Sequence, residues 1–199
     1  MASLHAFNKA IGRRGVRNTE GNTAMNPGST SLLQRLVKSE GVSRVMEIGF
    51  NAGHSANTLL AANPGITLTS FDLGRHGYEE KAKAAIDALY PGRHSLVLGD
   101  SRATVPAHEP GQPYDMIFID GGHINDIPAA DLANCRRLSH ANTIVLMDDI
   151  VVNDAWKKKY THAPTKAWAD MRDAGMLIED GHSDFRPGYG MSWGRYAIA

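Results

Sequence analysis

Short apolar segments alternate with longer amphipathic segments along most of this chain of 199 residues. The apolar segments have the length and composition of buried strands, and the segments between them repeat apolar residues at helical spacing. Strands separated by helices form βαβ units, which build a parallel sheet covered by helices on both faces. The alternation therefore predicts an α/β fold, Rossmann-like and doubly wound, with a mostly parallel sheet.

The predicted strands are Arg44–Gly49, Ile66–Asp72, His94–Asp100, Tyr114–Asp120, Asn142–Asp149, Met176–Glu179 and Ser192–Ile198. The predicted helices are Ser55–Asn63, Tyr78–Tyr90, Asp126–Leu138 and Thr165–Ala174. Only a loop separates the last two strands, so we expect them to form an antiparallel hairpin at one edge of the sheet.

The composition is that of an ordinary globular protein, with 42% apolar residues and 21 basic residues balanced by 21 acidic ones. This balance argues against nucleic acid as a partner. No apolar stretch is long enough for a membrane helix, so no membrane partner is expected. A single cysteine, Cys135, fits a reducing compartment, and we expect a cytoplasmic protein in which this thiol packs on a helix face.

Acidic residues recur where the first five predicted strands end. In open α/β sheets, ligands bind outside the carboxyl ends of the strands, where the strand order reverses. Any one of these acids could instead cap a helix or a turn, but together they predict an acidic rim. Its members are Glu47, Asp72, Asp100, Asp120, Asp148 and Asp149.

The stretch "VMEIGFNAGHSA" contains two glycines, Gly49 and Gly53, that three residues separate. This spacing departs from the G-x-G-x-x-G pattern of dinucleotide sites, which argues against a nicotinamide-dependent oxidoreductase. An acidic rim suits a ligand with positive charge and hydroxyl groups, such as S-adenosylmethionine. Glu47 could balance its amino group, and Asp72 could accept hydrogen bonds from its ribose. The two glycines would let it approach the backbone.

From about residue 23 to 151 the chain resembles class I S-adenosylmethionine-dependent methyltransferases. Within that class it is most similar to the metal-dependent small-molecule O-methyltransferases of the catechol O-methyltransferase type. The resemblance rests on "AMNPGSTSLLQRLV", "VMEIGFNAGHSA", "YDMIFIDGGH" and "IVLMDDIV". It implies a seven-stranded sheet of the methyltransferase type and O-methylation of a small hydroxylated molecule.

The resemblance also implies which residues bind the cofactor. An arm over residues 1–30 would cover the cofactor, and residues 31–199 would form one methyltransferase domain. The implied cofactor-binding residues are Met25, Asn26, Glu47, Gly49, Asn51, Gly53, His54, Ser55, Asp72, Leu73, Asp100, Ser101, Arg102 and Asp120.

Three carboxylates are predicted to bind a divalent cation: Asp120, Asp148 and Asp149. Oxygen ligands favour Mg²⁺, with Mn²⁺ and Ca²⁺ as alternatives. The catechol-type enzymes carry an asparagine where this chain has Asp149. They also carry a lysine general base at the position of His123, so the resemblance implies a catalytic base there. Asp120 would take part in catalysis with it.

The methyl acceptor is expected to be a small molecule, because little chain follows Val151. Its predicted contacts are Trp156, Tyr189 and Trp193, and a second subunit of a homodimer could complete the pocket. Two other functions stay open. One is methylation of RNA or another macromolecule, using the basic arm around Arg13 and Arg14. The other is a non-catalytic domain that binds S-adenosylmethionine.

Overall fold

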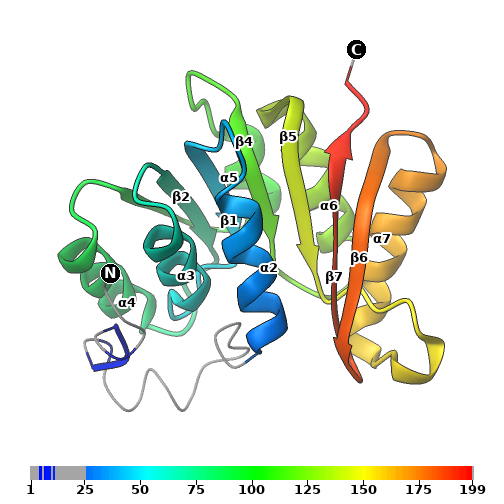
Figure 1. Ribbon diagram of the computed structural model, residues 1–199, viewed down its shortest axis with the longest axis horizontal. Helices are drawn as coiled ribbons and strands as arrows, with labels where there is room; N and C mark the ends of the chain where they lie inside the picture. Colours follow the sequence, from blue (N-terminus) through cyan, green and yellow to red (C-terminus); the bar gives the residue numbers. More distant parts are fainter. Residues whose placement is uncertain (1–4, 6, 10, 12–25, 199) are drawn as a thin grey trace.

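The computed structural model describes residues 5, 7–9, 11 and 26–198. Figure 1 shows helices on both faces of a central sheet. The elements are, in order, α2 (Pro27–Val37), β1 (Arg44–Ile48), α3 (His54–Ala62), β2 (Thr67–Asp72), α4 (Glu79–Leu89), β3 (His94–Leu98), α5 (Ser101–Ala107), β4 (Tyr114–Ile119), α6 (Ile127–Cys135), η2 (Arg136–Leu138), β5 (Ser139–Asp148), η3 (Asp154–Trp156), η4 (Lys159–Thr161), α7 (His162–Asp173), β6 (Leu177–Arg186) and β7 (Tyr189–Tyr196).

The strands form a 7-stranded sheet in the order β3-β2-β1-β4-β5-β7-β6. The first five strands pair in parallel, and β7 pairs antiparallel to both β5 and β6. The predicted doubly wound fold and the C-terminal hairpin are therefore confirmed. β6 extends well beyond the predicted Glu179, because its polar second half pairs with β7 as far as Arg186. Helix α5 was not predicted; it has 7 residues, too few for a clear helical period.

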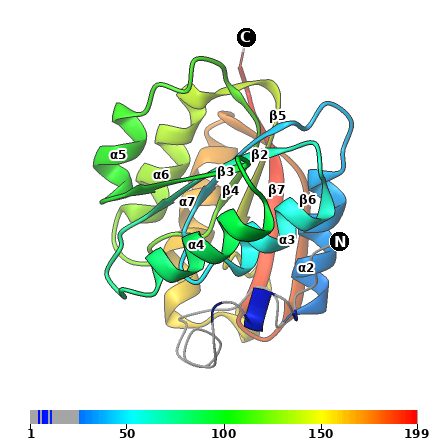
Figure 2. The same cartoon turned by 90° about the vertical axis from the view of Figure 1, so that its left-hand side faces the viewer.

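Alternate residues of the central strands enter two separate hydrophobic cores. In β1, Val45 belongs to the core beneath α2, α3 and α4, whereas Met46 and Ile48 belong to the core beneath α5, α6 and α7. Figure 2 shows these two layers of helices on opposite sides of the sheet. Because strand side chains alternate between faces, Glu47 lies on the Val45 face, where it meets Ser55 at the start of α3.

The expectation that the Cys135 thiol packs on a helix face is confirmed in the core beneath α5, α6 and α7. The thiol of Cys135 is fully buried on α6, and burial raises its pKa well above the ordinary value, so it packs rather than reacts. Trp168 of α7 is also buried, and its indole Nε1 donates to Glu179. Among the described residues, no helix combines the length and apolar character needed to cross a membrane.

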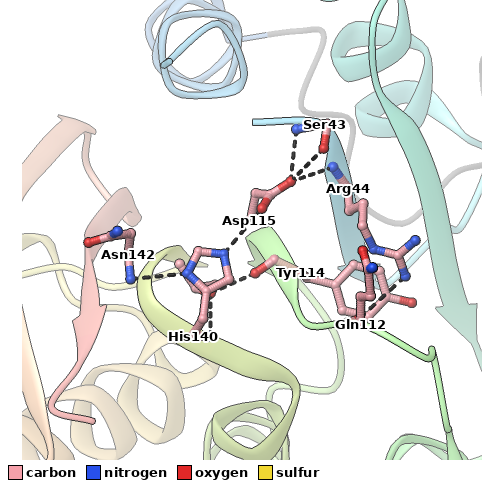
Figure 3. A network of polar contacts seen from close by, with 8 residues as sticks. Ser43, Arg44, Gln112, Tyr114, Asp115, His140 and Asn142 are labelled. Atoms are coloured by element: carbon pink, nitrogen blue, oxygen red, sulfur yellow. Dashed lines mark hydrogen bonds and ion pairs between the residues drawn. The ribbon is translucent and has the colours of Figure 1, made fainter. Parts of the chain in front are cut away.

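A carboxylate ties together the amino-terminal ends of three neighbouring strands. Asp115 Oδ2 accepts hydrogen bonds from the Ser43 amide and hydroxyl, both at 2.9 Å, and from the Arg44 amide at 2.7 Å (Figure 3). Its Oδ1 lies 3.1 Å from Nε2 of His140, whose Nδ1 accepts from the Asn142 amide. Because Arg44 begins β1 and His140 lies in β5, the carboxylate of β4 fixes the spacing of all three strands.

We predict that Asp115→Asn destabilises the fold in a pH-dependent way. Burial alone would raise the pKa of Asp115, but hydrogen bonds from Ser43, Arg44 and His140 outweigh it and lower the pKa. A lowered pKa stabilises the fold above the unfolded-state pKa, and this stabilisation is lost as the pH falls through the folded-state value. The variant should lose roughly 1–3 kcal/mol at neutral pH in urea unfolding, and less below about pH 4.

The control for this experiment is Asp173→Asn, which changes an exposed carboxylate paired only with its neighbour Arg172. It should cost less than about 0.5 kcal/mol. An equal loss in both variants, or a loss that does not shrink in acid, would contradict the role given to the Asp115 network.

Candidate active site

The strand order reverses between β1 and β4, so the carboxyl ends of these two strands border a crevice where ligands bind in open α/β sheets. The glycine loop follows β1, and the segment from Asp120 to His123 follows β4. The loop after β5 and the hairpin turn between β6 and β7 reach the same edge of the sheet, at the bottom of Figure 1. The fold therefore collects the predicted acids at one rim.

The backbone conformation at position 49 and a close contact with neighbouring backbone both require a glycine there. Its φ is +99°, and a Cβ placed there would lie 1.8 Å from the carbonyl oxygen of Asp120. The Gly49 amide donates to the Phe71 carbonyl at 2.8 Å, which fixes the loop to β2 as well. The sequence suggested that a ligand excludes a side chain here. The structure shows that the backbone of the neighbouring strand already does so, and contact with a cofactor stays a prediction.

The rest of the loop is held by Asp72 at the end of β2. Its Oδ2 accepts from the Asn51 amide at 2.7 Å and its Oδ1 from the Gly74 amide at 2.8 Å. Each carboxylate oxygen can accept a second hydrogen bond, so Asp72 can still bind a ligand's hydroxyl groups. Gly53 has a φ of +76° as the N-cap of α3, a conformation that glycine adopts without strain.

Glu47 is fully buried and begins a polar chain across three strands. Its carboxylate accepts hydrogen bonds from the hydroxyls of Ser55 and Ser70, and the Ser70 hydroxyl lies 2.9 Å from His94 Nε2. Burial raises the pKa of Glu47 to about 7, although both hydroxyls act to lower it. Burial also lowers the pKa of His94 to about 4, so a neutral imidazole faces Ser70. Sequence analysis missed Ser70 and His94, because neither stands in a motif.

His54 is the buried side chain with the most unused hydrogen-bonding capacity near the glycine loop. It opens α3 with 5% exposure, and neither ring nitrogen has a hydrogen-bond partner among the described residues. Its ring meets Phe7 edge-on, with the centroids 5.5 Å apart. Burial lowers the pKa of His54, so its imidazole is neutral. A buried polar group without a partner is costly, and this one could bind a polar ligand.

The loop after β3 has a structural explanation of its own. Asp100 caps α5 through the Arg102 amide at 2.9 Å and pairs with the Arg102 guanidinium at 2.7 Å. These hydrogen bonds lower the pKa of Asp100 to about 2. Asp131 of α6 is fully buried close to Gly121, and burial raises its pKa to about 6. Sequence analysis missed Asp131, because an acid within a helical segment reads as a surface residue.

Asp120, His123 and Asp149 form a tight cluster at the ends of β4 and β5. Each offers one ligand atom, and these atoms all lie within 4.8 Å of one another. His123 Nε2 is 3.0 Å from Asp149 Oδ2 and 3.7 Å from Asp120 Oδ1. Burial alone would lower the pKa of His123, but the two carboxylates raise it to about 10. In this arrangement the imidazole carries a proton at neutral pH, so it must lose that proton before it can act as a base.

Asp148 lies beside the cluster, but it makes different contacts. Its Oδ1 accepts from the Asp149 amide at 2.8 Å, and its Oδ2 lies 3.2 Å from the Tyr189 hydroxyl. Burial, together with the charges of Asp120 and Asp149, raises the pKa of Asp148 well above its ordinary value. The three-residue cluster thus contains His123 where the sequence suggested Asp148. Metal binding by Asp148 stays a prediction.

The predicted acceptor contacts occupy different places. Tyr189 reaches the rim through Asp148, and Trp156 is half-buried in η3 after β5. Trp193 pairs with Leu146 below the rim, where it lies against Gly181 and beneath the Arg35 guanidinium.

One residue that was not predicted lies near the cluster, and three of the predicted cofactor-binding residues remain to be placed. Tyr160, which sequence analysis missed, has its ring 6.0 Å from that of His123. Asn26 caps α2 through the amides of Gly28 and Ser29. Leu73 is exposed after β2, and Met25 lies outside the described residues.

A family model described as "Methyltransferase domain" matches residues 46–150, which is more than half of the chain. The chain belongs to this methyltransferase family. The match spans the glycine loop, Asp72, the cluster of Asp120 and His123, and Asp149. Its fold is that of the class I S-adenosylmethionine-dependent methyltransferases, as the resemblance implied. A comparison with curated proteins found no match.

Solved structures of methyltransferases share this fold at low sequence identity. An O-methyltransferase from Bacillus cereus in complex with S-adenosylhomocysteine has a TM-score of 0.77 and 17% identity, over 98% of this chain and 91% of that one. The O-methyltransferase TomG from Streptomyces achromogenes, involved in tomaymycin synthesis and bound to S-adenosylmethionine, has a TM-score of 0.73 and 21% identity, over 98% and 90%. The S-adenosylhomocysteine-bound methyltransferase PaMTH1 from Podospora anserina has a TM-score of 0.74 and 16% identity, over 98% and 89%.

We predict that Gly49→Ala is far more destabilising than Gly41→Ala. Both glycines have positive φ, +99° and +82°, but nothing lies within 4 Å of a Cβ at Gly41. Gly41→Ala should therefore cost only the strain of a left-handed alanine, about 1–2 kcal/mol. Gly49→Ala adds a clash with backbone and should cost several kcal/mol more or prevent folding. Similar unfolding midpoints for the two variants would show that the contact with Asp120 relaxes freely.

Proposed function

We propose that this protein transfers a methyl group from S-adenosylmethionine to a hydroxyl group of a small molecule, with help from a divalent cation. The observation that carries the proposal is the cluster of Asp120, His123 and Asp149 beside the glycine loop. It brings charged oxygen and nitrogen ligands to the rim where the family binds its methyl donor. Similarity in fold to O-methyltransferases from Bacillus cereus and Streptomyces achromogenes supports the same reaction.

The described residues on the β1 and β2 side fit S-adenosylmethionine. The neutral imidazole of His54 offers one N–H donor to the carboxylate of the methionine end, since neither ring nitrogen has a partner among the described residues. Asp72 has lone pairs left for the ribose hydroxyls, and the negative rim suits the positive amino and sulfonium groups. The ring of Phe7 packs edge-on against His54, which supports the predicted arm over residues 1–30 that covers the cofactor site.

The cluster fits a divalent cation, and its donor set narrows the choice of metal. Two carboxylates and one imidazole would hold the ion if His123 takes part. Imidazole suits transition metals, whereas Mg²⁺ prefers an all-oxygen site. With His123 as a ligand we therefore favour Mn²⁺ over Mg²⁺. With Asp148 in its place, the all-oxygen set predicted from the sequence would favour Mg²⁺.

The chain's residues would orient the acceptor and balance its charge. S-adenosylmethionine supplies an electrophilic methyl group on a sulfonium. The acceptor oxygen forms a bond to this carbon as the carbon–sulfur bond breaks, and the bonding electron pair goes to sulfur. The acceptor's hydroxyl proton passes to water, and a cation held by Asp120 and Asp149 would favour this transfer by lowering the pKa of that hydroxyl. His123 could take the proton only after releasing its own, so we place positioning and charge ahead of general-base catalysis.

Neither alternative gains support from the described residues. A macromolecular substrate would call for a basic surface beside the rim, whereas two of the three side chains in the cluster are carboxylates, and the basic arm around Arg13 and Arg14 lies outside the described residues. A non-catalytic domain would have no use for three ionisable groups within ligand distance of one another. We place the protein in the cytoplasm, because its one thiol is buried and its sequence fits a reducing compartment.

We predict that Asp72→Ala weakens S-adenosylmethionine binding at least tenfold, or about 1.4 kcal/mol. The change removes the ribose acceptor and also releases the Asn51 amide, so the loop loses its anchor. Calorimetric titration gives the dissociation constant. The control, Asp173→Ala, removes an exposed carboxylate on α7 and should bind as the wild type does. Wild-type affinity in Asp72→Ala would remove Asp72 from the cofactor site.

We predict that Asp149→Asn weakens Mn²⁺ binding about tenfold or more, because it removes one charge from the proposed site. His123→Gln should weaken Mn²⁺ binding but leave Mg²⁺ binding nearly unchanged if Mg²⁺ uses only carboxylates. Calorimetry on chelator-treated protein with each ion measures both effects. Neither substitution should change S-adenosylmethionine affinity by more than about twofold. No binding of either ion by the wild type would leave a methyltransferase without a metal.

A further inference from the structure

Each backbone amide at the start of the segment after β5 donates a hydrogen bond. Asp149 through Asn153 form five consecutive residues, and every one of their backbone amides has an acceptor. These are, in order, Asp148 Oδ1 at 2.8 Å, the Gly190 carbonyl at 3.1 Å, Thr165 Oγ1 at 3.2 Å, Asp184 Oδ1 at 3.2 Å and Asp184 Oδ2 at 3.0 Å. All five acceptors lie outside these five residues, and four of them belong to α7, β6 and β7, so other elements decide the path of the segment.

Asp184 accepts hydrogen bonds from two neighbouring amides, those of Val152 and Asn153. It belongs to β6, and a histidine of the same strand holds its carboxylate in place. His182 Nε2 lies 2.7 Å from Asp184 Oδ1, and His182 Nδ1 lies 2.9 Å from the hydroxyl of Ser192. Ser192 is fully buried in β7, directly across from His182. The carboxylate therefore has one orientation, fixed by the hairpin.

Gly190 lets the hairpin and the segment come this close. A Cβ at this position would lie 2.4 Å from the Ile150 carbonyl oxygen and 2.7 Å from Asp184 Oδ1. The contact between β7 and the segment therefore depends on a residue without a side chain.

The turn at Asp149 needs such support. Asp149 has a φ of +57°, a left-handed conformation that is unfavourable for a residue with a side chain. Strain of this kind persists only where the surrounding structure over-determines it, and it is concentrated at functional sites. Here the turn brings the Asp149 carboxylate to 3.0 Å from His123. Without the turn, the cluster would lose one of its three members.

We propose that Asp184, oriented by His182, is a positioning residue for this site. Its carboxylate clamps the amides of Val152 and Asn153, and the clamp keeps Asp149 in the left-handed turn that completes the cluster with Asp120 and His123. Within the part of the chain that the structure describes, Asp184 forms no hydrogen bond or ion pair with the cluster or the glycine loop, so its effect reaches the site through the segment. What the completed cluster does rests on the function proposed above, but the clamp itself does not.

The test compares Asp184→Asn with Asp180→Asn. An asparagine at 184 has one carbonyl oxygen, and its NH₂ group would face one of the two amide donors. Asp180 lies on the same strand, but its carboxylate forms an exposed ion pair with Arg195 at 3.0 Å. The measurements are the dissociation constants for Mn²⁺ and S-adenosylmethionine, and amide hydrogen exchange over residues 149–156.

In Asp184→Asn the Mn²⁺ dissociation constant should rise by about tenfold to a hundredfold, as for other residues that support metal ligands from behind. S-adenosylmethionine affinity should stay within about twofold. Exchange should accelerate at Val152 and Asn153 and also at Asp149 and Ile150, upstream of the clamp. Asp180→Asn should match the wild type in every measurement. His182→Ala, which leaves the carboxylate in place, should change the same quantities in the same direction but less.

Faster exchange confined to Val152 and Asn153, with unchanged Mn²⁺ affinity, would overturn the inference, because Asp149 would then hold its turn without the clamp. If the wild type binds no Mn²⁺, the metal assignment fails, and exchange at Asp149 and Ile150 alone decides the clamp. If Asp184→Asn loses S-adenosylmethionine binding, the substitution has disturbed the structure beyond this segment. His182→Ala then replaces it as the test variant, and hydrogen exchange at Asp149 and Ile150 decides whether the inference holds.

Discussion

The contact between Gly49 and the Asp120 carbonyl sets the distance between the two halves of the candidate site. β1 and β4 leave the sheet side by side where the strand order reverses, and their backbones continue past the last paired residues. The Asp120 amide donates to the Ile48 carbonyl at 2.8 Å, while the space above Gly49 is filled by the Asp120 carbonyl itself. The glycine loop and the Asp120 to His123 segment therefore form one rigid unit. Any ligand that touches both is positioned by backbone geometry.

Burial makes a charged carboxylate unfavourable at the rim. Different neighbouring groups offset this cost for Glu47, for Asp148 and for the carboxylates of the cluster. Hydroxyls from one strand and one helix, those of Ser70 and Ser55, solvate Glu47, and its raised pKa shows that they only partly replace water. Asp120 and Asp149 instead share the positive charge of His123. Asp148 is approached by the neutral hydroxyl of Tyr189. Asp120 and Asp149, which share His123 as an ionic partner, are the two carboxylates of the cluster. A cation that displaced the His123 proton would find the site already shaped for positive charge.

Sequence patterning predicted the sheet well, because alternating strands and helices leave few other arrangements. It also found the rim, since the carboxyl ends of parallel strands meet at one edge. It could not find α5, whose short run has no clear period, or the full length of β6, whose polar half reads as a loop. Ser70, His94, Asp131 and Asp184 escaped for a related reason. Each acts through a contact between elements far apart in sequence, and no local pattern marks it. His123 was identified, but its place between two carboxylates required coordinates.

The two sides of the site are built on different principles. On the β1 and β2 side, backbone amides and a fixed carboxylate hold the loop against the sheet, so its shape follows directly from the fold. On the β5 side, the segment is held by the side chain of Asp184 and the carbonyl of Gly190 in the C-terminal hairpin, and by Thr165 of α7. Asp184 acts there through its side chain, whereas Gly49 is constrained by the backbone of Asp120. A fold constructed this way can keep the backbone shape of the glycine loop while the contacts on the β5 side change. The hairpin, which pairs with the sheet only through β7, is the part with room for such change.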